Sequence, residues 1–259
     1  MDDIANYNRA RWSAVTRAQA VFTRPYLDLS EATAREWLDT RGPVDEVRGK
    51  RVLCLAGGGG QQSAIFAILG ARVTVFDLSP EQLERDRQAA AHYGVKIATH
   101  QGDMRDLSSL GAESFDIVWH PYSINFVPDA RAVFGQVARV VRVGGLYHFN
   151  CANPFSAGLS KADWNGTGYT LRLPYQDGAE VNYPDQDWVH SGDEAVPPPR
   201  EYRHTLSTLL NGLLEAGFRL RRFSDTADYT PDAGAEPGSD DHLTAYAPPW
   251  LSFWATREE

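Results

Sequence analysis

The chain has 259 residues, of which 42% are hydrophobic and 23% charged, a composition typical of one globular domain with an insertion or of two small domains. Acidic residues (34) outnumber basic ones (25), so the formal net charge is -9 and there is no basic field to attract nucleic acid or anionic lipid. No apolar stretch is long enough to cross a membrane and the first residues lack a secretion-signal pattern, so we expect a cytoplasmic protein with no nucleic-acid or membrane partner.

The first part of the chain predicts a helical cap followed by an α/β core. In residues 1–42, apolar positions recur with a helical period that Pro25 interrupts, which predicts two helices. Residues 43–150 change to short β-branched runs, namely RVLCLA, RVTVFD, KIATHQGD, FDIVWHP and GLYHFN. The helices expected between them span 61–69, 80–92 and 129–140. Such alternation is typical of a doubly wound parallel sheet.

The rest of the chain predicts an insertion and a closing unit. Residues 151–204 lack the alternation and hold six large rings: Trp164, Tyr169, Tyr175, Tyr183, Trp188 and Tyr202. We expect a lid over a substrate pocket, although packing against the core is the commoner role of any one ring. Residues 205–259 predict a helix ended by Gly217 and two strands, FRLRRF and WLSFWATR, at the sheet edge. The acidic stretch 225–241 is expected to be a solvated loop.

Four consecutive glycines, residues 57–60, connect the first buried strand to a helix. Such a loop, at the carboxyl end of a strand in a wound sheet, is where small ligands bind. Asp77 ends the next strand, twenty residues after Gly57, where a carboxylate can accept hydrogen bonds from ribose hydroxyls. The dinucleotide G-x-G-x-x-G and the Walker patterns are both absent. Gly102-Asp103-Met104 follows the third strand, where a carboxylate and a thioether suit an adenine.

This ordered set of motifs resembles the class I S-adenosylmethionine-dependent methyltransferases over about residues 48–150, and the last two strands look like those of that family. The resemblance implies a seven-stranded Rossmann-like sheet, mostly parallel with an antiparallel last strand, in a single domain. It also implies S-adenosyl-L-methionine as cofactor and S-adenosyl-L-homocysteine as product. Cys54 and Ala56 depart from the family, which often has an acid and a glycine there. A bacterial subgroup with an AGGGGQQS loop is the most similar pattern.

The resemblance also implies residue roles. The glycine loop corresponds to the site of the methionine part, Asp77 to the ribose site, and Asp103 with Met104 to the adenine site. The residues implied to contact the cofactor are Ala56, Gly57, Gly58, Gly60, Gln62, Asp77, Leu78, Gly102, Asp103, Met104 and His120.

The loop after the fourth strand, in FDIVWHPYSINF, faces the methyl group in such enzymes. It supplies the candidate catalytic residues His120, Tyr122 and Asn125. A packed histidine that shapes the turn at Pro121 explains His120 equally well. The candidate substrate-binding residues are Tyr7, Trp12, Asn150, Trp164 and Tyr202.

The sequence therefore predicts methyl transfer to a small organic acceptor by in-line displacement, with the acceptor atom and oligomeric state left open. A methyltransferase acting on RNA or protein is one alternative, but the Asn/Asp-Pro-Pro-aromatic tetrad is absent and His120-Pro121-Tyr122 stands in its place. A non-catalytic S-adenosylmethionine-binding protein and a dinucleotide oxidoreductase are further alternatives. Cys54 and Cys151 are too few for a disulfide framework and lack metal-ligand spacing, so we expect neither a disulfide nor a metal.

Overall fold

The computed structural model describes residues 2–44, 46–183, 196–226 and 229–259. Its α-helices are α1 (Asp3–Arg17), α2 (Glu31–Thr40), α3 (Gln62–Ile68), α4 (Pro80–Tyr93), α5 (Ala130–Val140), α6 (Leu206–Glu215) and α7 (Asp240–Tyr246). Its strands are β1 (Arg51–Leu55), β2 (Arg72–Asp77), β3 (Ile97–Gln101), β4 (Phe115–His120), β5 (Val141–Ala152), β6 (Glu180–Val181), β7 (Glu201–Tyr202), β8 (Phe218–Ser224) and β9 (Trp250–Arg257). Short 3-10 helices are η1 (Val21–Thr23), η2 (Ile124–Phe126) and η3 (Lys161–Asp163).

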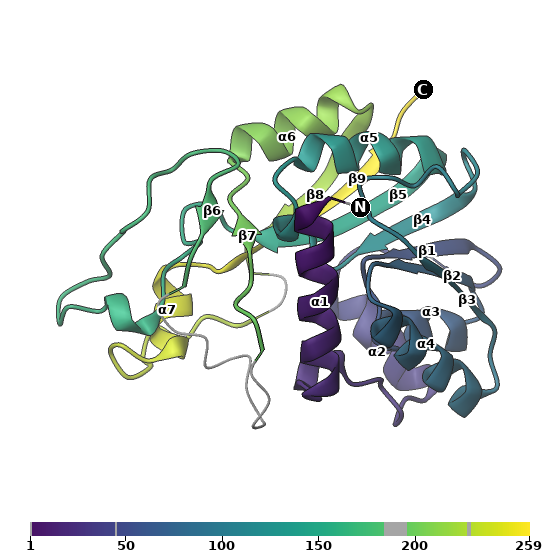
Figure 1. Ribbon diagram of the computed structural model, residues 1–259, viewed down its shortest axis with the longest axis horizontal. Coiled ribbons are helices and arrows are strands. Elements are labelled where there is room, and N and C mark those ends of the chain that lie inside the picture. The colour runs from purple at the N-terminus through teal and green to yellow at the C-terminus, as the bar shows by residue number, and fades with distance from the viewer. Residues whose placement is uncertain (1, 45, 184–195, 227–228) are drawn as a thin grey trace.

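A seven-stranded sheet in the order β3-β2-β1-β4-β5-β9-β8 forms the centre of the protein (Figure 1). β1 pairs in parallel with both β2 and β4, and β3 and β5 extend the sheet in parallel on either side. β9 pairs antiparallel with β5 and β8. The predicted Rossmann-like fold with an antiparallel last strand is confirmed. Because the chain winds away from β1 in both directions, the crevice beyond the carboxyl ends of β1 and β4 is the expected ligand site.

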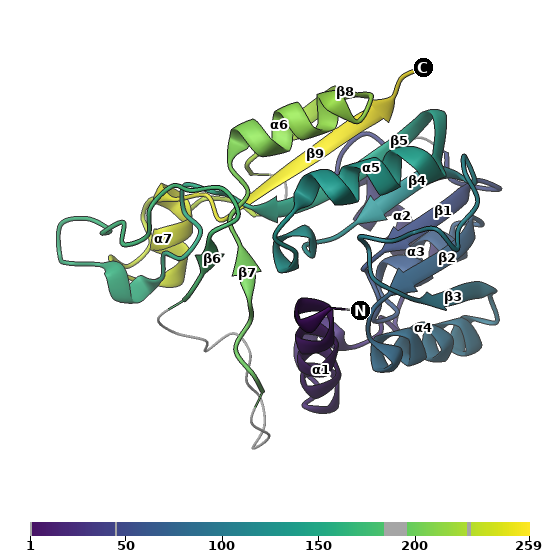
Figure 2. The ribbon, with the colours of Figure 1, turned by 45° about the horizontal axis from the view of Figure 1, so that its top comes forward.

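Alternating residues of β1 supply two separate cores. Leu53 and Leu55 belong to the cluster that also contains residues of α5 and α6. Val52 and Cys54 belong to the cluster with residues of α2 and α3. Figure 2 shows α5 and α6 on one side of the sheet and α3 and α4 on the other. A strand that is buried on both faces explains why the run RVLCLA is almost continuously apolar.

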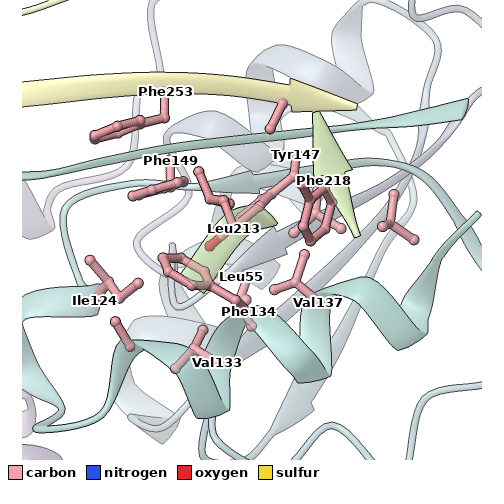
Figure 3. Close-up of a cluster of buried hydrophobic side chains, with 14 of the residues drawn as sticks. Leu55, Ile124, Val133, Phe134, Val137, Tyr147, Phe149, Leu213, Phe218 and Phe253 are labelled. Carbon is pink, nitrogen blue, oxygen red and sulfur yellow. The ribbon is translucent and has the colours of Figure 1, made fainter. Parts of the chain in front are cut away.

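A group of aromatic rings packs together within the first of these cores (Figure 3). Phe149 of β5 stacks on Phe253 of β9, with ring centroids 4.7 Å apart, and Phe134 of α5 lies 5.4 Å from Phe149. Gly212 lets α6 approach α5 closely, because a Cβ there would lie 2.9 Å from the Phe134 ring. This packing fixes α5 and α6 over the half of the sheet that the later strands form.

The helices predicted at 61–69, 80–92 and 129–140 agree with α3, α4 and α5 to within one residue at each end. The solvated loop predicted at 225–241 is wrong at its end, because α7 begins at Asp240 with Ser239 as its N-cap. His242 of α7 is buried, and Tyr169 of the insertion donates a hydrogen bond to its Nδ1 over 2.8 Å. The predicted lid ring Trp188 lies outside the described residues. None of the described helices is both long and apolar enough to span a bilayer.

Phe134→Ala tests how much the aromatic core contributes to the free energy of unfolding. Phe134 is completely buried, so we expect the free energy of unfolding to fall by about 3–5 kcal/mol through lost burial and a new cavity. Urea denaturation measures the change. Leu214→Ala on α6 is the control, because Leu214 is 61% exposed and its loss should cost less than about 0.5 kcal/mol. Equal losses in the two variants would contradict this account of the core.

Candidate active site

A cavity of about 740 Å³ lies at the carboxyl ends of the parallel strands. Its floor is made by residues at or just beyond the ends of β1 to β4, among them Ala56, Asp77, Gly102 and Pro121. Its walls come from α1, from the insertion that carries β6 and β7, and from α7 with the residues after it. Figures 1 and 2 show α1 between the sheet and the β6–β7 pair. The volume is within the range of ordinary ligand sites.

The glycine loop forms the part of this floor next to β1. The amide of Gly58 donates to Oδ2 of Asp77 over 2.9 Å. A Cβ on Gly58 would lie 2.8 Å from Cβ of Gln82, and one on Gly57 would lie 3.0 Å from the ring of Pro121. Ala56 has φ of 46°, in the left-handed region where glycine is favoured, so the residue that departs from the family pattern also holds a strained backbone. The loop thus has no room for side chains on the glycines that line the cavity.

Gly60 serves the loop in a different way and does not line the cavity. A Cβ on Gly60 would lie 2.6 Å from the carbonyl oxygen of Arg85, and its φ is 72°. The next helical residue, Gln62, does line the cavity. The loop therefore packs on α4 through Gly60 and faces the ligand space through its neighbours.

Asp86 of α4 anchors this loop, although the sequence analysis did not single it out. Its carboxylate accepts hydrogen bonds from the amides of Gly59 (3.1 Å) and Gly60 (3.0 Å) and from the hydroxyl of Ser63. Asp86 is completely buried, and burial raises its pKa to about 7. The buried acid replaces water as the partner of loop amides that no strand or helix satisfies.

Asp77 connects the loop to the ligand space. Besides Gly58, it binds the amide of Ser79, which donates to Oδ1 over 2.8 Å. Burial raises the pKa of Asp77, and these amide bonds oppose the effect by favouring the ionised form. Asp77 and the adjacent Leu78 both line the cavity. Each carboxylate oxygen can accept a second hydrogen bond, so Asp77 can bind a pair of ligand hydroxyls.

Gly102, Asp103 and Met104 line the cavity on the β3 side. The carboxylate of Asp103 is ion-paired with Arg105, and Arg105 also binds Asp2 at the start of α1 through two nitrogens, each 2.8 Å from a carboxylate oxygen. The predicted adenine-site acid is thus also part of the connection that holds α1 over the cavity.

The loop after β4 brings only one of the three candidate catalytic residues to the cavity. Tyr122 lines it, next to Pro121. His120 is fully buried behind the wall, with Nδ1 2.9 Å from the hydroxyl of Tyr147, and burial lowers its pKa to about 3. Asn125 is also buried, where its Oδ1 accepts from the amide of Ala152 and its Nδ2 donates to the carbonyl of Tyr202. His120 and Asn125 therefore hold the fold together around the loop, which is the packed role left open for His120.

Two of the five candidate substrate-binding residues line the cavity. Trp12 of α1 does so with its ring at right angles to that of Phe126, 5.4 Å between centroids. Asn150 reaches the cavity from β5. His148, on the same face of β5, instead packs in the core against Trp119, with ring centroids 3.9 Å apart.

The other three lie away from the cavity. Tyr7 donates its hydroxyl hydrogen bond to the carbonyl of Pro198. Trp164 packs against His242 of α7, with ring centroids 4.9 Å apart. Tyr202 is buried, and its carbonyl accepts from Asn125. These rings tie the insertion to α1, α7 and the β4 loop instead of contacting the ligand space.

The structure adds lining residues that the sequence analysis did not name as site residues. Glu201 of β7 and Tyr183 of the insertion line the cavity together with Tyr122. Leu243 and Thr244 of α7 and Trp250 of β9 close it further out. Glu201 is one of eight acidic residues in the insertion 151–204, so no sequence signal distinguished it from the others.

Comparison with known proteins agrees with this geometry. A family model described as a methyltransferase domain matches residues 53–149, which run from β1 into β5. The Bacillus subtilis protein named uncharacterized methyltransferase YbaJ is 34% identical over 181 residues, which cover 68% of this chain and 69% of that protein. The chain belongs to the class I S-adenosylmethionine-dependent methyltransferases.

Two further relatives of this methyltransferase are informative. The ubiquinone biosynthesis O-methyltransferase of Xanthomonas axonopodis pv. citri is 31% identical over 169 residues, which cover 59% of this chain and 70% of that enzyme. The crystal structure of an S-adenosylmethionine dependent methyltransferase from Mesorhizobium loti has the same fold, with a TM-score of 0.63 and 24% identity over 90% of this chain and 100% of that one.

S-adenosylmethionine is the cofactor of this methyltransferase. The cavity fits it, because Gly57 and Gly58 present bare backbone to the cavity, where a ligand can approach closely. The carboxylate of Asp77 faces that space with acceptor capacity to spare, and Met104 adds a polarizable apolar surface on the β3 side.

Asp86→Asn should weaken S-adenosylmethionine binding about tenfold without any contact to the ligand. An asparagine offers one neutral acceptor oxygen where the carboxylate offers two, so both amides lose a charged partner and one of them, of Gly59 or Gly60, loses its acceptor. Calorimetric titration measures the affinity. Glu84→Gln is the control, because Glu84 lies on the exposed face of the same helix. Unchanged affinity in Asp86→Asn would show that the buried acid does not shape the loop.

The pH dependence of stability checks Asp86 independently. The folded pKa is about 7, whereas an unfolded aspartate titrates near ~3.9. Between these values the folded chain binds more protons, so the contribution of Asp86 to the free energy of unfolding falls as pH rises from about 4 to about 7. Asp86→Asn lacks this titration, so the stability difference should shift in favour of the variant across that range, by at most about 1.4 kcal/mol per pH unit. Urea unfolding at several pH values measures both proteins, and parallel curves would contradict the raised pKa.

Proposed function

We propose that residues 1–259 form one domain that transfers the methyl group of S-adenosylmethionine to a small organic acceptor. The supporting observation is the extent of the cavity, which continues beyond the glycine loop between α1, the insertion and α7 and is lined there mainly by apolar side chains. An acceptor that enters this space leaves bulk water, and exclusion of water favours displacement at a sulfonium carbon.

In this proposal the cofactor and the acceptor occupy adjoining parts of one cavity. The cofactor contacts Ala56, Gly57, Gly58, Gln62, Asp77, Leu78, Gly102, Asp103 and Met104. The acceptor contacts Tyr122, Trp12 and Asn150. The residues that support the walls without lining the cavity are Gly60, His120, Asn125, Tyr7, Trp164 and Tyr202. The cap, residues 1–42, and the insertion, residues 151–204, thus serve the acceptor side, whereas the core serves the cofactor.

Methyl transfer depends mainly on the alignment of the cofactor with the acceptor. When bound, S-adenosylmethionine supplies a methyl group on a positively charged sulfur. Asp77 accepts hydrogen bonds from the ribose hydroxyls and so fixes the cofactor along the sheet edge. Trp12 and Phe126 form an apolar wall that orients the acceptor, and Asn150 offers it a polar contact. Holding both partners in line supplies much of the rate enhancement of such a displacement.

No observation favours the alternative functions. The net charge of -9 opposes RNA as the acceptor. The name of the Xanthomonas relative, a ubiquinone biosynthesis O-methyltransferase, supports a small molecule. We include in the proposal a bacterial source in the AGGGGQQS-loop subgroup and a cytoplasmic location, supported by the bacterial relatives and by two buried cysteines, Cys54 and Cys151, that form no disulfide.

Calorimetric titration with S-adenosylmethionine, S-adenosylhomocysteine and NAD tests the cofactor half of the proposal. Both adenosyl ligands should bind and NAD should not. Asp77→Ala should weaken them about 10-fold to 100-fold, the usual effect of losing hydrogen bonds to a charged acceptor. Asp28→Ala is the control, because Asp28 is exposed.

The acceptor half is tested by S-adenosylhomocysteine formation in pools of small metabolites. Binding of NAD alone, or cofactor binding without turnover in any pool, would contradict the proposed function.

A further inference from the structure

A buried carboxylate lies at the acceptor end of the cavity. Glu201 is 2% exposed and lines the cavity. Two tyrosines that also line it donate to the same oxygen, Oε2: Tyr122 over 2.8 Å and Tyr183 over 3.2 Å. Within the described ranges, no residue donates a hydrogen bond to the other carboxylate oxygen, Oε1. The carboxylate therefore has one oxygen held by phenols and one oxygen available to a ligand.

The backbone around Glu201 is held firmly against the β4 loop. Besides the Asn125 bond to the carbonyl of Tyr202, His204 donates from Nε2 to the carbonyl of Ile124 over 3.1 Å. Arg203 donates to the carbonyl of Ala157 over 2.8 Å. The three residues that follow Glu201 thus hold its backbone in place relative to the β4 loop and to Ala157.

The same loop connects the carboxylate to the glycine loop. Pro121 lies directly against Gly57, whose Cβ position is 3.0 Å from the proline ring. Tyr122 follows Pro121 and binds Glu201. Two short contacts therefore connect the glycine loop, on which the cofactor lies, to Glu201.

The charges around Glu201 are few. Within the described residues, the titratable groups that act on it are Tyr122 from the β4 loop, Tyr183 from the insertion and Arg11 from α1. Burial raises the pKa of Glu201, and these three groups lower it by less. A carboxylate with a raised pKa is a stronger base than one in water and suits the proton of a phenol better than that of an aliphatic alcohol.

We propose that Glu201 is the general base of this methyltransferase and that the acceptor is a phenolic hydroxyl. The inference rests on the proposed function. In the step, the acceptor oxygen forms a bond to the methyl carbon while the carbon–sulfur bond breaks and leaves its electron pair on sulfur. The hydroxyl proton passes to Oε1 of Glu201 and later to water. A neutral amine or a thiolate needs no such base, so a buried carboxylate at this position distinguishes oxygen acceptors.

The shape of the lining agrees with an aromatic acceptor. Trp12, Phe126, Tyr122 and Tyr183 all line the cavity, and flat apolar walls of this kind pack well against a ring. We therefore use three probes with the same ring and different acceptor atoms, namely 2-naphthol, 2-naphthylamine and 2-naphthalenethiol.

Binding is measured first, by fluorescence titration of each probe into the protein saturated with S-adenosylhomocysteine. We expect 2-naphthol to bind, and Glu201→Gln to weaken it at least fivefold, because a neutral amide accepts a weaker hydrogen bond than a carboxylate. Glu180→Gln is the matched control, because Glu180 lies in the facing strand β6, is exposed and pairs with Arg200. Equal binding in wild type and Glu201→Gln, or no binding of 2-naphthol, would overturn the proposal.

Transfer of a labelled methyl group is measured next. We expect methylation of 2-naphthol, with kcat reduced at least about 100-fold in Glu201→Gln and unchanged in Glu180→Gln. Affinity for S-adenosylmethionine should stay the same in both variants, which separates a chemical role from a folding defect. Methylation of only the amine or thiol probe, or a Glu201→Gln rate within a few-fold of wild type, would overturn the proposal while the methyltransferase function stands. Failure of all three probes to react would also overturn it, and the metabolite pools decide the function itself.

The pH dependence of the methyl-transfer rate distinguishes a general base from a residue with a purely structural role. The base must be ionised, so the rate should fall as pH drops through the pKa of Glu201. Tyr183→Phe removes a hydrogen bond that favours the ionised carboxylate, so it should move this acidic limb to higher pH. A limb that stays in place in Tyr183→Phe would count against Glu201 as the base.

Discussion

The close approach of the glycine loop to helix α4 is the constraint on which the site depends. The loop passes between the end of β2 and α4 with so little space that a Cβ on Gly58 or Gly60 would collide with Gln82 or with the backbone of Arg85. At this separation the loop amides cannot reach water, so carboxylates from the neighbouring elements, Asp77 and Asp86, accept their hydrogen bonds. The same contacts that shape the loop therefore decide where the acid facing the cofactor lies.

The sequence predicted the core well because the core depends on local patterns. Apolar runs of strand length and the twenty-residue spacing from Gly57 to Asp77 each follow from rules that act within a short stretch of the chain. Asp86 escaped prediction because it lies among charged residues on α4 and differs from its neighbours only in facing the loop. The packing of the loop decides which face of this charged helix is buried, and the helix sequence alone does not indicate it.

Residues beyond β4 were harder to predict because distant partners decide their roles. His120 ends β4 and Asn125 lies in the loop that follows it, yet their side chains turn toward Tyr147 and toward Ala152 and Tyr202. α7 was hidden in an acidic stretch because its main stabilising contact, His242 with Trp164 and Tyr169, joins segments more than seventy residues apart. A local pattern carries no information about such pairs, so three of the aromatic residues expected to bind a substrate, Tyr7, Trp164 and Tyr202, instead contact other parts of the fold.

The two halves of the cavity come from different parts of the chain. The match to the methyltransferase domain covers residues 53–149, which carry the glycine loop, Asp77 and the loop after β4. The acceptor side is built largely outside that range, from α1, the insertion with Glu201, and α7. Arg105 of the core binds Asp2 at the start of α1, and Asn8 of α1 donates to the carbonyl of Phe126. Asn125 of the β4 loop likewise donates to the carbonyl of Tyr202 in β7. Under the proposed division of the cavity, the shared core fixes the methyl donor, whereas the segments attached to it decide which nucleophile reaches the methyl group.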